Sequence, residues 1–162
     1  MSDVFVNSRG REVFADDVVP AVEDGYFAIF IKNKKVLLYW PPYGEAAEFV
    51  GGVCPRGEDK AASLSRMLYE QSGFESAIGK PEKIWSQEVD YFDARAANPF
   101  IHYRQVFGLF DAAKYPLVER DKNWVTPDGG AAMWEDLGAL FRGEIELNYT
   151  HMAALKALVA ED

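Results

Sequence analysis

The chain has 162 residues, of which 49% are hydrophobic and 14% aromatic, which is enough for a single domain whose core needs no metal or disulfide to fold. A formal net charge of -9 argues against nucleic acid or an anionic membrane as the main partner, because both would be repelled. The single cysteine, Cys54, excludes an internal disulfide and is typical of a reducing compartment.

The N-terminal sequence MSDVFVNSRG lacks the charged start and apolar centre of a signal peptide, and no apolar run reaches membrane-spanning length. We therefore expect a cytoplasmic protein. The longest basic cluster, Lys32, Lys34 and Lys35, lies at a predicted hairpin tip and is too small to create a nucleic-acid site.

Two hairpins are predicted in the first quarter of the chain. Residues 3–14 place apolar runs on either side of a Ser-Arg-Gly turn, so residues 1–24 form an N-terminal hairpin extension that ends in an acidic connection, 15–24. This hairpin is expected either to pack on the domain or to reach across to a second copy. The β-rich runs 26–31 and 36–40, joined by KNKK, predict the second hairpin.

The central stretch, residues 51–74, predicts a glycine loop and a helix. An apolar run ending at Val50 leads into Gly51 and Gly52, and a loop then enters a helix that we expect to begin near residue 59 or 60 and to end at Gly73. A strand, a glycine-rich loop and a capped helix together form a common phosphate-binding scaffold. The residues of this segment expected to contact the core are Ala62, Leu64, Leu68 and Phe74.

The second half of the chain predicts more strands and a terminal helix. The elements are strands at 83–92 and 101–110 around a polar connector at 93–99, an irregular section at 111–130, a strand end with a short helix at 133–141, and a helix at 150–160 with Thr150 as its N-cap. This order predicts one α/β domain over residues 1–162, an α/β/α sandwich with a mixed sheet between helices.

Residues 52–74 resemble a known motif at fixed intervals. The resemblance is to the 23-residue box of the Nudix hydrolases, which reads Gly, five residues, Glu, seven residues, Arg-Glu-apolar, any, Glu-Glu, any, Gly-apolar. The matching residues are Gly52, Glu58, Arg66, Leu68, Glu70, Gly73 and Phe74. The resemblance implies the Nudix fold and hydrolysis of a nucleoside diphosphate linked to another moiety, with Mg²⁺ or Mn²⁺. It also implies that the N-terminal strands can take part in a homodimer, as they do in some Nudix enzymes.

Two positions depart from the box, because Met67 and Gln71 stand where the family carries metal-binding glutamates. Helix positions 66, 67, 70 and 71 lie close together, and of these four residues only Glu70 offers a carboxylate. A thioether is a poor ligand for a hard cation, and an amide oxygen carries no charge. We therefore expect weakened or altered hydrolysis, and the alternative is a catalytically inactive domain that binds nucleotides or regulates.

The candidate site residues follow from the box and its flanks. By the resemblance, the catalytic and metal-binding residues are Glu58 and Glu70, and the substrate-binding residues are Gly51, Gly52, Arg56, Arg66 and Arg104. A carboxylate from a later loop would complete a metal site, and the candidates are Glu88, Asp90, Asp93, Glu119 and Glu135.

Other side chains have less specific roles. Cys54 would need a nearby base to act as a nucleophile. The alternative interpretation is that Cys54 is a small, partly buried loop residue without a catalytic role. We interpret His102 as a hydrogen-bonded strand residue, and both His102 and His151 lie outside any metal-ligand spacing. One or two aromatic residues are expected to stack on a nucleobase, out of Tyr26, Trp40, Tyr43, Trp85, Tyr91 and Tyr103.

Overall fold

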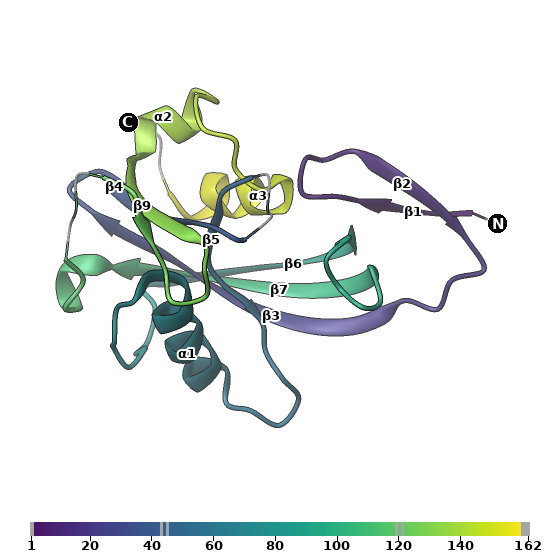
Figure 1. Ribbon diagram of the computed structural model, residues 1–162, viewed down its shortest axis with the longest axis horizontal. Coiled ribbons are helices and arrows are strands. Elements are labelled where there is room, and N and C mark those ends of the chain that lie inside the picture. The colour runs from purple at the N-terminus through teal and green to yellow at the C-terminus, as the bar shows by residue number, and fades with distance from the viewer. Residues whose placement is uncertain (1, 43, 45, 119, 121, 160–162) are drawn as a thin grey trace.

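The computed structural model describes residues 2–42, 44, 46–118, 120 and 122–159. Within them, one mixed sheet of nine strands runs in the order β2-β1-β6-β7-β3-β5-β4-β9-β8. Helix α1 lies on one side of this sheet, and helices α2 and α3 lie on the other (Figure 1). The predicted α/β/α sandwich with a mixed sheet is confirmed.

The N-terminal residues form the predicted hairpin. Strands β1 (Ser2–Val6) and β2 (Glu12–Asp16) pair antiparallel, and β1 meets β6 in parallel at Val6 and Tyr91. The hairpin extends from one end of the molecule (Figure 1), while its turn contacts the domain, since the Tyr149 N–H donates to the Ser8 carbonyl at 2.7 Å.

The central strands confirm the predicted order with one correction. The remaining strands are β3 (Ala21–Lys32), β4 (Lys35–Trp40), β5 (Glu48–Val53), β6 (Lys83–Phe92), β7 (Phe100–Asp111), β8 (Trp124–Val125) and β9 (Ala131–Asp136). Residues 21–24 belong to β3, although the sequence predicts a connection there. The reason is the long parallel ladder with β7, which begins at Ala21 and Ile101 and supplies the hydrogen bonds of this polar segment.

Helix α1 (Lys60–Ser72) begins and ends as predicted. The Asp59 carboxylate accepts the Ala62 N–H at 3.0 Å, and Gly73 takes the left-handed conformation, with φ of 81°, that suits a glycine cap. Leu64, Leu68 and Phe74 are buried as expected. Ala62 is exposed instead, because its side chain lies on the solvent face of the first turn.

The C-terminal half contains η1 (Ala112–Lys114), α2 (Leu137–Phe141) and α3 (Tyr149–Leu158). The N-cap of α3 is Asn148, so the assignment of Thr150 is wrong. The Asn148 Oδ1 atom accepts the Thr150 N–H at 3.0 Å, and asparagine is among the best N-cap residues. None of the helices in the described part of the chain has the length and apolar character that a membrane span needs.

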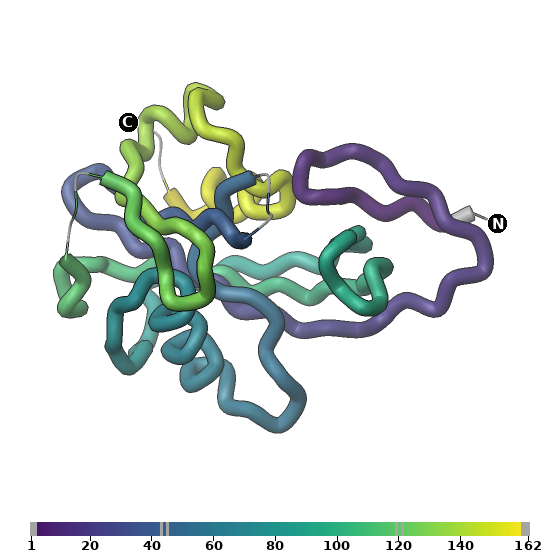
Figure 2. Tube along the Cα trace, in the orientation of Figure 1, coloured from purple at the N-terminus to yellow at the C-terminus, as the bar shows by residue number. Residues whose placement is uncertain are grey.

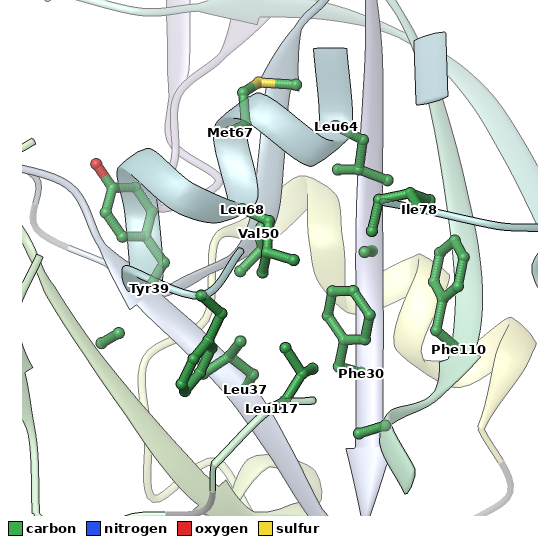
Figure 3. Packing of buried hydrophobic residues seen from close by; sticks show 14 of the residues in the cluster. Phe30, Leu37, Tyr39, Val50, Leu64, Met67, Leu68, Ile78, Phe110 and Leu117 are labelled. Carbon is green, nitrogen blue, oxygen red and sulfur yellow. The ribbon is translucent and has the colours of Figure 1, made fainter. Parts of the chain in front are cut away.

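The core lies in two layers, one on each face of the sheet. Along β3, Tyr26, Ala28 and Phe30 pack toward α1, while Phe27 and Ile29 pack toward α3. In Figure 3, Leu64 and Leu68 of α1 lie next to the part of the cluster that contains Phe30 and Val50, and Met67, which belongs to the same cluster, lies farther from Phe30. Both faces of β3 are therefore covered. Because β5 pairs with β3 and α1 packs on it, β3 holds β5 and α1 in place.

Candidate functional site

A cavity of about 210 Å³ opens where β5 leads toward α1. Its walls come from β3, β4, β5, β6, β7, the end of α1, α3 and the connections beside them. The lining residues are Phe27, Tyr39, Pro41, Glu48, Gly51, Gly52, Val53, Gln71, Tyr91, Asp93, Arg95, Ile101, Tyr103, Gln105, Asn148 and His151. Gly51, Gly52 and Gln71 of the box therefore lie in this cavity, together with polar residues that come from outside the box.

Gly51 must be a glycine because of its backbone. Its φ of 140° lies in a region that side chains avoid, and a Cβ atom there would lie 2.2 Å from the Tyr26 carbonyl oxygen. Its N–H donates to the Gln71 Oε1 atom at 2.9 Å, and the Gln71 Nε2 atom donates to the Gly51 carbonyl at 2.8 Å. Gln71 thus links the end of α1 to β5. Gly51 lines the cavity, but its N–H is already bound to Gln71.

Met67 faces β5. Its side chain is 5% exposed and belongs to the core cluster under α1. A Cβ atom built on Gly52 would lie 3.3 Å from the Met67 sulfur, which shows how closely the thioether approaches the glycine. The two box positions without a carboxylate, 67 and 71, therefore both contact the glycine pair.

The retained charged residues of the box form one ion-paired group. Arg66 contacts the Glu58 Oε1 atom at 3.1 Å and the Glu70 Oε1 atom at 3.2 Å, and the Ser63 hydroxyl also donates to Glu58. These hydrogen bonds, first from Ser63 and then from Arg66, lower the pKa of Glu58. The arginine holds the loop before α1 against the helix.

Glu58 and Glu70 are the residues of the box that suit a divalent metal ion. Mg²⁺ is commonly held by one or two carboxylates together with substrate phosphate oxygens. Arg66 contacts one oxygen of each carboxylate, which leaves the second oxygen of each as the natural ligand. No cluster of three or more His, Cys, Asp or Glu side chains that could hold a metal was found among the described residues. The pair thus fits a metal that arrives with substrate phosphates.

The cavity also contains a charged group that the sequence did not single out. Glu48 lies in its wall with 15% of its side chain exposed, and Arg95 contacts the Glu48 Oε2 atom at 3.6 Å and the Asp93 Oδ1 atom at 3.3 Å. Burial raises the pKa of Glu48 to about 7, and the opposing effect of Arg95 does not cancel it. A carboxyl group with a raised pKa in a cavity is a common feature of functional sites.

The two predicted phosphate-binding arginines outside the helix do not line this cavity. Arg56 is exposed on the loop before α1. Arg104 lies on β7, where its Nε atom contacts the Asp24 Oδ1 atom at 2.7 Å, and it lines two other hollows on the sheet. The structure therefore does not bring Arg56 and Arg104 together with Gly51 and Gly52.

Of the later acids that the structure describes, Asp93 is the one that lines the cavity. Glu88 and Asp90 line the hollows beside Arg104, and Asp90 accepts a hydrogen bond from His102, the strand histidine. Glu135 lies on β9, where burial raises its pKa. Glu119 lies outside the described residues.

Aromatic rings also line the cavity. Of the six candidates, Tyr91 and Tyr103 lie in its wall, Tyr26, Trp40 and Trp85 pack in or against the core layers, and Tyr43 lies outside the described residues. His151 also lines it, with its Nδ1 atom accepting the Phe49 N–H at 3.1 Å, and burial lowers its pKa to about 3. Cys54 is buried, which raises its pKa, as expected of a partly buried loop cysteine.

No family model matches the sequence, and no curated protein matches it either. Solved structures do match the fold. A MutT Nudix hydrolase from Burkholderia pseudomallei is 20% identical, with a TM-score of 0.55, over 85% of this chain and 98% of that one. The Nudix domain of Shewanella oneidensis NrtR, complexed with ADP ribose, is 14% identical with a TM-score of 0.52 over 86% of each chain.

A bifunctional NMN adenylyltransferase/ADP ribose pyrophosphatase from Francisella tularensis, complexed with AMP and a manganese ion, gives a TM-score of 0.58 at 19% identity. This match covers 89% of the present chain and 42% of the Francisella chain. The shared architecture agrees with the resemblance of residues 52–74. The protein therefore has the fold of the Nudix hydrolase superfamily.

Proposed function

We propose that this chain is a single Nudix-type domain in the cytoplasm that hydrolyses a nucleoside diphosphate linked to another moiety, with activity weakened by the changes at Met67 and Gln71. The observation that carries the proposal is the Glu58–Arg66–Glu70 group, which is partly exposed and does not line the cavity, on the helix whose end contributes Gln71 to the cavity that Gly51 and Gly52 line. Solved relatives of the same fold have been seen with ADP ribose, and with AMP and manganese.

In the proposed reaction, water forms a bond to one phosphorus of the pyrophosphate, the bridging P–O bond breaks, and the proton of the water passes to solvent. Glu58 and Glu70 would hold Mg²⁺ or Mn²⁺, which supplies charge neutralisation at the pyrophosphate and lowers the pKa of a bound water. Arg66 orients both carboxylates through its ion pairs. The glycines allow the ligand to approach β5 closely.

A second candidate, a binding or regulatory domain without turnover, is favoured by the contacts of the two changed positions. Met67 is packed into the core, and both ends of the Gln71 amide bind Gly51. Neither side chain is available to a metal ion in this arrangement. Met67 does not line the cavity and Gln71 lines it as a neutral amide, so the cavity can bind a nucleotide derivative without hydrolysing it.

Titration of Mg²⁺ and Mn²⁺ against a panel of nucleoside diphosphate compounds, with product release followed by chromatography, tests the first proposal. Metal-dependent turnover would support the hydrolase. Tight binding of a panel member with no turnover at any metal concentration would support the second candidate and contradict the first.

We also propose that the N-terminal hairpin takes part in a homodimer. Phe14 on β2 is 65% exposed and Val19, just after the hairpin, is 86% exposed, so the projecting hairpin presents apolar side chains that a second copy could cover. Light scattering should give twice the chain mass for the wild type and a lower mass for Phe14→Ser. A monomeric wild type at high concentration would contradict the dimer.

A further inference from the structure

A second cavity adjoins the cavity beside the box. This second cavity has a volume of about 230 Å³, and Glu48, Tyr91, Asp93 and Arg95 line both. The second cavity extends to the turn of the N-terminal hairpin, where Asn7 contributes to its wall. Figure 2 shows the teal connection after β6 next to the purple hairpin. The four shared residues therefore lie between the cavity of Gly51 and Gly52 and the cavity at the hairpin turn.

The charges around the two cavities favour an uncharged occupant. Glu48 and Asp93 carry the carboxylates and Arg95 carries the guanidinium, and among the lining residues that the structure describes no other side chain has a formal charge at neutral pH. Arg95 is already shared between the two acids. The local balance is therefore negative, and the formal charge of the whole chain, -9, adds to it.

Glu48 also has hydrogen-bonding capacity to spare. Its Oε2 atom lies 3.5 Å from the Asn148 Nδ2 atom and 3.6 Å from the nearest Arg95 nitrogen, both at or beyond the limit of a hydrogen bond. An ionised carboxylate accepts hydrogen bonds and donates none. A ligand hydroxyl would supply the missing donor, whereas the oxygens of an ionised phosphate would face the carboxylate as a second set of acceptors.

We propose that the walls shared by these adjoining cavities bind the moiety linked to the nucleoside diphosphate, and that this moiety is an uncharged group with neighbouring hydroxyls, such as a pentose, rather than a further phosphate. The inference rests on the proposed function, of which it names the substrate class. Glu48 accepts the hydroxyl hydrogens, Arg95 donates to the hydroxyl oxygens, and Tyr91 offers a ring face beside them.

Calorimetry at pH 8 in Mg²⁺, with ADP-ribose and ATP as the two probes, tests this inference. Because burial raises the pKa of Glu48 to about 7, most of this carboxyl group is ionised at pH 8. ADP-ribose should bind at least about tenfold more tightly than ATP, since the terminal phosphate of ATP would meet the carboxylates. Glu48→Gln, and separately Asp93→Asn, should narrow this ratio severalfold by removing a negative charge from the cavity walls.

The matched control is Glu75→Gln, which removes the same charge from an exposed residue that lines neither cavity and should keep the wild-type ratio. Two different variants are used because either alone could affect folding, which a thermal melt checks. Wild-type binding of ATP as tight as that of ADP-ribose, or a ratio unchanged in both cavity variants, would overturn the inference and leave the hydrolase proposal standing. Binding of neither probe would overturn the inference, and binding of no member of the nucleoside diphosphate panel would overturn the hydrolase proposal as well.

Discussion

At the scale of single residues, the two unusual positions of the box have structural roles. Gln71 gives Gly51 both a donor and an acceptor, which a glutamate could not do, since an ionised carboxylate only accepts. Met67 fills the space between α1 and Gly52. Sequence reasoning treated both as lost metal ligands, and the structure adds that each connects the helix to β5.

Gln71→Glu should therefore destabilise the protein. The Gly51 carbonyl would lose its donor in a half-buried site, which costs about 1 to 3 kcal/mol of unfolding free energy. Urea denaturation measures this loss, with Glu70→Gln on the same helix as a control that keeps the Gly51 contacts. A Gln71→Glu protein as stable as the wild type would show that the Gln71–Gly51 pair contributes nothing.

Glu48 should make stability depend on pH. Its folded pKa, about 7, lies above the ordinary value of 4.5, so the folded state holds a proton that the unfolded state has released between these pH values. Ionising Glu48 in the folded state therefore lowers the free energy of unfolding. This loss is absent below pH 4.5, grows as the pH rises and is complete above pH 7. Glu48→Gln removes this cost and should gain on the order of 2 kcal/mol at pH 8 relative to pH 4.5.

Paired urea titrations at pH 8 and pH 4.5 measure this difference, and Glu75→Gln serves as the exposed control that should show no such change. An equal effect of Glu48→Gln at the two pH values would mean that the carboxyl group titrates normally and is not shielded from water.

At the scale of elements, helix α1 shows which features the sequence specifies. Its ends depend on local contacts, the Asp59 cap and the Gly73 turn, so the sequence predicts them well. Its inward face depends on what β5 presents to it, which explains why Met67 and Ser63 are buried and Ala62 is exposed. Residue type alone did not decide between the core and a solvent-facing ridge for Met67.

Met67→Glu tests the orientation of this helix. The new carboxylate would enter the core cluster without a partner, so we expect a loss of about 3 kcal/mol or more in the free energy of unfolding. Met67→Leu keeps the apolar contact and should cost less than about 1.5 kcal/mol. If the two variants were equally stable, residue 67 would have to reach solvent. A glutamate at position 67 could then act as a metal ligand on that face of the helix.

The other elements show the same limit of sequence reasoning. Strand β3 begins at Ala21, inside an acidic segment, because β7 lies beside it, and this pairing is a tertiary contact. Asn148 replaces Thr150 as the helix cap by a shift of two positions, which is the usual error for a helix end. Glu48 and Arg95 are far apart in the chain, and only the sheet order brings them to one cavity.

At the scale of the whole molecule, the sheet separates two core layers. The polar cavity lies where β5 and the end of α1 meet, at Gly51, Gly52 and Gln71. The resemblance of residues 52–74 predicted the fold, which the solved structures confirm, and it named Glu58, Arg66 and Glu70 as site residues, which the structure links through the two ion pairs of Arg66. It did not predict the second, adjoining cavity, because the residues there come from β5, the connection after β6 and the N-terminal hairpin.

The most direct test of the central claim, a weakened but metal-dependent hydrolase, is the kcat/KM for ADP-ribose in Mn²⁺ of the wild type and of Glu70→Gln. The account predicts slow turnover that requires the metal and that falls by about 10²-fold or more in the variant, while calorimetry shows that ADP-ribose still binds. The opposite result, ADP-ribose bound by the wild type without turnover at any Mn²⁺ or Mg²⁺ concentration, would contradict it.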